Sequence, residues 1–159
     1  MRRLVSVAFA LATLASPLAA QSHPDFSGKW VLDPKSVEAG GMPAPTSGSL
    51  TVAQDPKTVR VESVASSQMG EQKSSMTYNL DGTAAKNTIS ANGMSMELSS
   101  TAKWDDQALA ITTTGDMNGQ SLTFTERWSL DDGGKVLHMQ RDISAGGQSL
   151  SMKFTFNKQ

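Results

Sequence analysis

Two opposite charges, Glu126 and Arg141, occur on otherwise apolar faces of what the sequence predicts to be one long β-hairpin. Across residues 120–143 apolar side chains alternate with polar ones, and Gly133-Gly134 marks a turn. A two-residue turn there would set Glu126 directly opposite Arg141. The guanidinium could then bind the acid group of a ligand, or be neutralised by its carboxylate partner. We favour neutralisation, because the hairpin itself supplies the partner; both roles hold if a ligand competes for Arg141.

Other residues capable of catalysis are scarce. The chain has no cysteine and only two histidines. His23 precedes the first predicted strand, and His138 would lie opposite Ser129 on the outward face of the hairpin. No nucleophile elbow or phosphate-binding loop occurs, and the aspartates at hairpin tips are ordinary turn residues. We therefore expect a protein that is not an enzyme, with no catalytic residues and no cofactor.

Methionine is the one soft metal ligand in good supply, with nine in the chain. Met94 and Met96 would place two thioethers on one face of a strand, and Cu(I) prefers soft sulfur ligands. No third ligand lies at short spacing, however, and methionine also fills irregular apolar cavities. We predict no metal site and keep a Cu(I) carrier as a remote alternative.

The scaffold for these side chains is predicted from regularly spaced turn signals after Gly48. They are Asp55-Pro56-Lys57, Met69-Gly70, Asp81-Gly82, Asn92-Gly93, Asp106-Gln107, Asn118-Gly119, Gly133-Gly134 and Gly146-Gly147. The intervening segments have the length and alternation of β-strands, without helical periodicity. A first strand around Trp30 brings the number of strands to about ten.

Neighbouring hairpins also agree on which side chains face inward, although a slip of one residue would invert a strand. Two-residue loops would pair Leu109 with Trp128, Met139 with Phe154, Ile89 with Met96, and Tyr78 with Ala85. This agreement predicts an all-β fold, a single up-and-down antiparallel meander. So wide a sheet with one apolar face should close into a barrel in which the last strand meets the first.

Residues 1–20 have the features of a secretory signal peptide: Arg2 and Arg3, an apolar run and a small-residue end. We therefore expect one barrel domain over residues 21–159, exported to a periplasm or secreted, with no membrane-spanning segment after cleavage. Without the two arginines, 12 basic and 15 acidic side chains remain and no basic block occurs. Nucleic acid is accordingly not an expected partner.

Gly28-Lys29-Trp30, followed by a long loop and a meander, resembles the start of the lipocalin and fatty-acid-binding-protein group of barrels, the calycins. Phe26 to Trp30 is also similar to the opening of small secreted bacterial lipocalin-like proteins of unassigned function. The resemblance implies that Trp30 packs at the closed end against a basic side chain from a late strand. Arg141 is the nearest match by type, while Lys158 lies at the end of the last strand.

The resemblance and the many small polar residues on the inward face together predict a partly hydrated cavity. We expect it to bind a small apolar or amphipathic molecule, which could carry a carboxylate. The predicted lining is Trp30, Tyr78, Trp104, Phe124, Glu126, Trp128, Met139 and Arg141. The segment Asp33 to Ser47 could cover the opening as a lid or be a plain surface loop. The alternative function is a structural or interaction protein of the cell envelope with a filled core.

Overall fold

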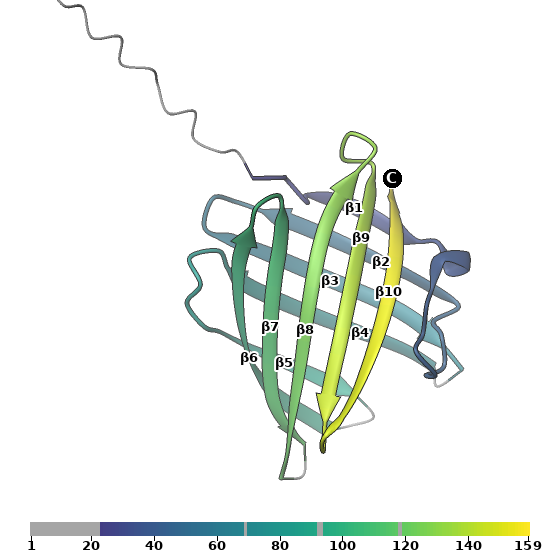
Figure 1. Cartoon of the computed structure of the whole chain (residues 1–159), viewed down its shortest axis with the longest axis vertical. Coiled ribbons are helices and arrows are strands. Elements are labelled where there is room, and N and C mark those ends of the chain that lie inside the picture. The colour runs from purple at the N-terminus through teal and green to yellow at the C-terminus, as the bar shows by residue number, and fades with distance from the viewer. Residues whose placement is uncertain (1–22, 69, 92–93, 118) are drawn as a thin grey trace, which may run out of the picture.

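The computed structural model describes residues 23–68, 70–91, 94–117 and 119–159 (Figure 1). The predicted signal peptide, residues 1–20, lies outside them. The strands in this part of the chain are β1 (Gly28–Leu32), β2 (Ser47–Gln54), β3 (Thr58–Ser67), β4 (Gly70–Asn79), β5 (Ala85–Ala91), β6 (Met94–Asp105), β7 (Ala108–Met117), β8 (Gln120–Asp131), β9 (Val136–Ala145) and β10 (Gln148–Lys158). The helix present there is a single 3₁₀ turn, η1 (Pro34–Ser36).

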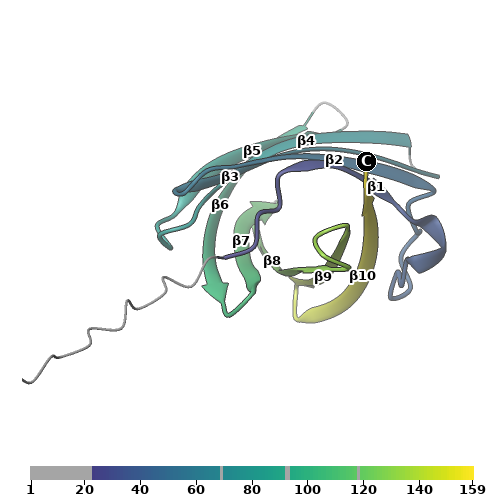
Figure 2. The same ribbon diagram turned by 90° about the horizontal axis from the view of Figure 1, so that it is seen from above.

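All ten strands belong to one antiparallel sheet, in the order β4-β3-β2-β1-β10-β9-β8-β7-β6-β5. The sheet curls so that β6 to β10 face β2 to β5 across the interior (Figure 2). The first strand pairs with the last, with Trp30 as the register partner of Lys158. The predicted all-β meander barrel is therefore confirmed.

The hairpin registers predicted from alternation hold across most of the sheet. Glu126 pairs with Arg141 and Leu109 with Trp128, and the pairs Met139–Phe154 and Ile89–Met96 also form. The turn at Gly133-Gly134 is wider than the two-residue form expected. It is a loop in which the amides of Gly134 and Lys135 donate to the carbonyl of Asp131 at 3.0 and 3.1 Å. Because it widens symmetrically, the register is unchanged.

The predicted pairing of Tyr78 with Ala85 was wrong, because β4 and β5 are the two ends of the sheet and form no backbone ladder with each other. The side chain of Asn87 bridges them instead. Its Oδ1 accepts from the Thr77 amide at 2.7 Å, and its Nδ2 donates to the Thr77 carbonyl at 2.9 Å. One carboxamide thus satisfies both backbone groups of Thr77. The barrel is nearly closed, with a seam between β4 and β5 where no backbone ladder forms.

One end of the barrel is filled by large apolar side chains. Phe26 and Trp30 are fully buried, and the Trp30 Nε1 donates to the Phe26 carbonyl at 2.9 Å. The Phe26 ring packs edge-on against Trp128, 5.8 Å between centroids. Lys158, not Arg141, lies over the Trp30 ring, with its Nζ 5.1 Å from the centroid. The late-strand basic residue implied by the resemblance is therefore on the last strand.

After β1, the segment that leads to β2 runs beside β10 (Figure 1). The turn η1 ends at Ser36, because the backbone of Glu38 beyond it pairs with that of Lys153. Gly40 has φ +57°, and a Cβ there would lie 2.3 Å from the Ser151 carbonyl oxygen. The segment is thus seated on β10. No helix in the described residues is long and apolar enough to cross a bilayer.

Candidate functional site

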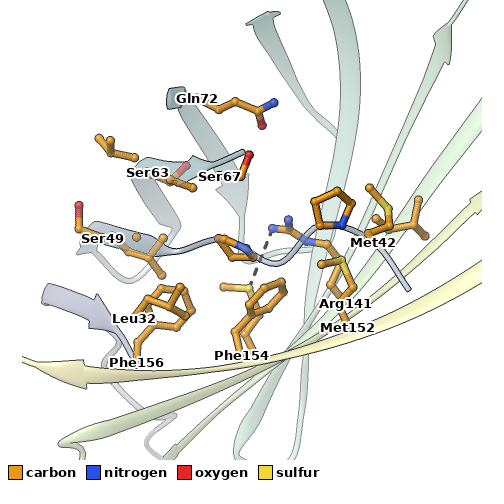
Figure 3. A pocket seen from close by; sticks show the side chains of 18 residues that line it. Leu32, Met42, Ser49, Ser63, Ser67, Gln72, Arg141, Met152, Phe154 and Phe156 are labelled. Carbon is orange, nitrogen blue, oxygen red and sulfur yellow. Dashed lines mark hydrogen bonds between the residues drawn. The ribbon is translucent and has the colours of Figure 1, made fainter. Parts of the chain in front are cut away.

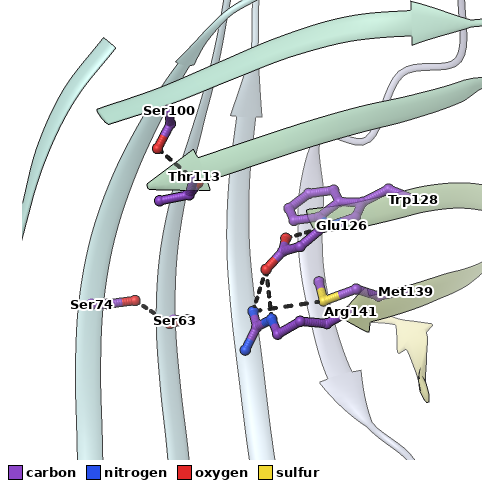
Figure 4. A network of polar contacts seen from close by, with 8 residues as sticks. All are labelled: Ser63, Ser74, Ser100, Thr113, Glu126, Trp128, Met139 and Arg141. Carbon is purple, nitrogen blue, oxygen red and sulfur yellow. Dashed lines mark hydrogen bonds and ion pairs between the residues drawn. The ribbon is translucent and has the colours of Figure 1, made fainter. Parts of the chain in front are cut away.

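Glu126 and Arg141 form an ion pair inside the barrel, as the register predicted (Figure 4). The Glu126 Oε1 accepts from Arg141 Nε at 2.6 Å and lies 2.6 Å from Nη2. The other oxygen, Oε2, accepts from the indole Nε1 of Trp128 at 2.9 Å. Both carboxylate oxygens are therefore held by protein donors, and the Glu126 side chain is only 8% exposed.

The hydrogen-bonding groups of Arg141 are less fully used than those of Glu126. Its side chain is 36% exposed, and its Nη2 also approaches the thioether of Met139 at 4.0 Å. Among the residues that the structure describes, no acceptor bonds to Arg141 Nη1. In the same residues, every buried side-chain nitrogen or oxygen has a hydrogen-bond partner. Nη1 must therefore reach open space. Since guanidinium carries five donors, Arg141 retains donors for a ligand while bound to Glu126.

The electrostatics of the pair extend to Tyr78, which is buried on β4. Glu126 raises the pKa of Arg141, so this guanidinium stays charged at every physiological pH. Burial raises the pKa of the Tyr78 hydroxyl well above its ordinary value, and the negative charge of Glu126 adds to the effect. The site therefore presents a permanent cation beside a neutral phenol.

A first cavity of about 290 Å³ lies beneath the segment between β1 and β2 (Figure 3). Its walls are mainly apolar side chains from β2, β9, β10 and the covering loop, and Arg141 projects into it. The lining is Leu32, Met42, Pro43, Pro45, Gly48, Ser49, Leu50, Ser63, Val64, Ala65, Ser67, Gln72, Met139, Arg141, Ile143, Met152, Phe154 and Phe156. Met42, Pro43 and Pro45 place the predicted lid segment at this cavity, as the lid alternative requires.

A second cavity of about 300 Å³ lies on the other side of Arg141, toward the seam between β4 and β5. Its wall is mixed, with hydroxyl and amide side chains among apolar ones. The lining is Ser63, Ala65, Gln72, Lys73, Ser74, Met76, Tyr78, Ile89, Ser90, Leu98, Thr113, Phe124, Glu126 and Arg141. Behind it, hydrogen bonds connect Asn87 to Ser100 at 3.1 Å and Ser100 to Thr113 at 2.9 Å. The cavity predicted from the inward polar residues has its counterpart here, and its hydration stays a prediction.

The eight predicted lining residues divide between these cavities and the filled end of the barrel. Tyr78, Phe124 and Glu126 line the second cavity, Met139 lines the first, and Arg141 lines both. The tryptophans lie outside both linings. Trp30 and Trp128 are buried in the closed end, and Trp104 stacks between His23 and Phe26, at centroid distances of 4.3 and 6.0 Å. Their contact with a ligand stays a prediction.

Sequence reasoning left Met42, Pro43 and Gln72 out of the candidate lining. Gln72 lies on β4 near the seam. Because β4 and β5 were expected to pair, no opening was predicted between them. The two loop residues lie in a segment without periodicity, so no pattern could have assigned them a direction. Among the described residues, no three histidine, aspartate or glutamate side chains come together as a metal site; the side chain of Met94 lies outside the described part.

No family model matches the chain, and a search of curated proteins finds no match. Solved structures do match its fold. Secretory abundant heat soluble protein 4 from Ramazzottius varieornatus has a TM-score of 0.57 and 16% identity over 88% of this chain and 99% of that one. Zebrafish ileal bile acid-binding protein, solved with cholic acid, has a TM-score of 0.50 and 11% identity over 84% and 98%.

A luciferase domain from the dinoflagellate Lingulodinium polyedrum has a TM-score of 0.51 and 11% identity, covering 88% of this chain and 46% of that one. These structures are calycin-like barrels. At such low identity they establish the fold alone. The chain therefore has a calycin-like barrel fold.

Proposed function

We propose that this protein binds a small amphipathic molecule bearing an acid group inside the barrel, without catalysing a reaction. The apolar part lies in the first cavity under Met42 and Pro43, and the acid group meets Arg141. The signal peptide predicted from the sequence supports a location in a periplasm or outside the cell. The bile acid-binding neighbour supports binding of an amphipathic acid as a use of this fold.

The observation that carries the proposal is that protein groups use the hydrogen-bonding capacity of Glu126 fully and that of Arg141 only in part. Protein donors occupy both oxygens of Glu126, whereas Arg141 faces two cavities with Nη1 unpartnered among the described residues. A pair that served neutralisation alone would have no need of open space beside the cation. Glu126 and Trp128 thus orient a guanidinium that remains able to bind an acid.

The alternative function, an envelope protein with a filled core, does not account for the interior. Each of the two cavities has the volume of a small binding site, about 300 Å³ at the lower end of the usual range. Close-packed cores contain few voids larger than a water molecule. The cavities are also adjacent, since both include Ser63, Ala65 and Arg141 in their walls.

Palmitate binding, measured by calorimetry, tests the proposal. Arg141→Met alone would leave Glu126 buried without its cation, so the test uses the double variant Glu126→Gln/Arg141→Met, which removes both charges. We expect affinity to fall about 10- to 100-fold, the effect of losing a charge-assisted hydrogen bond. Arg127→Met is the control, because Arg127 lies on the outward face of β8 and pairs with Asp105.

Unchanged palmitate affinity in a folded double variant would refute Arg141 as the anchor. Native mass spectrometry of protein purified from its own compartment supplies an independent measurement. A stoichiometric acidic adduct that is absent from the double variant would support the proposal. An adduct retained equally by both proteins would contradict it.

A further inference from the structure

The two cavities differ in chemistry on opposite sides of Arg141. The first is walled by aliphatic and aromatic side chains such as Leu50, Ile143 and Phe154. The second presents hydroxyl groups from Ser63, Ser74 and Tyr78. Apolar side chains such as Met76 and Leu98 also line the second cavity, so its wall is mixed. A wholly apolar ligand there would cover the hydroxyl groups without replacing their hydrogen bonds to water.

The polar wall has donors and acceptors left for a ligand. Ser63 and Ser74 bond to each other at 2.7 Å (Figure 4). Whichever hydroxyl accepts in that pair keeps its own proton to donate elsewhere. No group among the described residues bonds to the Tyr78 hydroxyl. Because every buried side-chain oxygen in these residues has a partner, the Tyr78 oxygen must be accessible from the cavity. These groups suit a polyhydroxylated ligand.

Arg141 lies at the junction rather than at the end of either cavity. It contributes to both walls, together with Ser63, Ala65 and Gln72. A fatty acid would place its carboxylate at one end and leave the second cavity to water. A ligand that uses both cavities must carry its acid group in the middle, between an apolar chain and a hydroxylated head.

On this basis, and resting on the proposed function, we infer that the ligand is a single-chain lipid with a phosphodiester between its acyl chain and a hydroxylated head. The acyl chain lies in the first cavity, the phosphodiester meets Arg141, and the head bonds to Ser63, Ser74 and Tyr78 beside the seam. A phosphodiester is the common chemical group that is anionic and also joins two substituents.

The test compares two lipids with the same palmitoyl chain and the same single charge: lysophosphatidylglycerol, whose head has hydroxyls, and lysophosphatidylethanol, whose head has none. Calorimetry is run below their micelle concentrations, with palmitate as the headless acid. We expect lysophosphatidylglycerol to bind about tenfold more tightly than lysophosphatidylethanol, the gain from one or two neutral hydrogen bonds.

Two variants locate that difference. Tyr78→Phe and the double variant Ser63→Ala/Ser74→Ala should each bring the two lysolipids closer together in affinity. The readout is the ratio of the two affinities, from which any change shared by both lipids cancels. Ser75→Ala is the control, because Ser75 is exposed on the opposite face of β4. It should leave the tenfold preference intact.

The outcomes separate this inference from the proposed function. If the wild-type protein binds palmitate through Arg141 but binds both lysolipids equally, the hydroxylated head is refuted and acid binding stands. A preference that survives in both cavity variants would also refute the assignment of the second cavity. If palmitate affinity is unaffected by removing Arg141, the proposed function itself fails.

Discussion

Lys158, the last residue of β10, lies over the indole ring of Trp30 on β1, with 5.1 Å between its Nζ and the ring centroid. The two are register partners, so the contact forms where the first and last strands meet. An ammonium group over an indole face is attracted by the ring electrons. The contact therefore stabilises the pairing of β1 with β10 at the end of the barrel that Phe26 fills.

Replacing Lys158 with methionine should weaken this closure. The long stem remains, so the change removes mainly the cation over Trp30, and we expect the free energy of unfolding to fall by about 0.5 to 1 kcal/mol. Urea unfolding measures the loss. Lys86→Met is the control, because Lys86 is exposed on β5; an equal loss in both variants would show that the contact contributes nothing.

Asn87→Ala should open the seam between β4 and β5. The change leaves the amide and carbonyl of Thr77 without their partner, which we expect to cost about 2 to 4 kcal/mol in urea unfolding. Hydrogen exchange at the Thr77 amide should accelerate. Thr88→Ala, at the next and exposed position of β5, should do neither. An unaltered Thr77 exchange rate in Asn87→Ala would contradict the bridging role.

The raised pKa of Tyr78 predicts a loss of stability at alkaline pH. Above the ordinary tyrosine pKa of about 10, the unfolded chain releases a proton that the folded protein retains. Unfolding then becomes more favourable as pH increases, until the folded-state pKa is passed. Tyr78→Phe should remove that part of the decline.

Ultraviolet absorption checks the same point directly, because Tyr78 is the one tyrosine in the sequence. Phenolate absorption should be missing from the folded protein at pH values where the urea-unfolded chain shows it. Identical titration curves for the folded and unfolded protein would contradict the burial of the hydroxyl.

Gly40→Ala should release the segment that covers the first cavity. An added Cβ would meet the Ser151 carbonyl oxygen at 2.3 Å, and φ +57° is unfavourable for alanine. Gly41→Ala is the matched control: φ is +99° there, but nothing lies within 4 Å. We expect Gly40→Ala to lose about 1 to 3 kcal/mol more than the control. Limited proteolysis near Met42 should also be faster; equal rates would refute the seating on β10.

The sequence by itself determined the strands, their order along the chain and most of their registers. Alternation with a period of two leaves one orientation for each strand once a face is buried, and turn residues place the ends. The pairing of Glu126 with Arg141 followed from this local information. It held even though the loop at Gly133-Gly134 was wider than expected, because both sides lengthened equally.

Only the tertiary structure decided where the barrel stays open and which end is filled. Whether Asn87 bonds to Thr77 depends on the curvature of the whole sheet, not on the neighbours of either residue. The position of Phe26 depends on an irregular segment folding back over the barrel end, and that of Met42 on a loop running beside β10. Such long-range placements set which inward side chains line a cavity and which, like Trp30 and Trp128, become core.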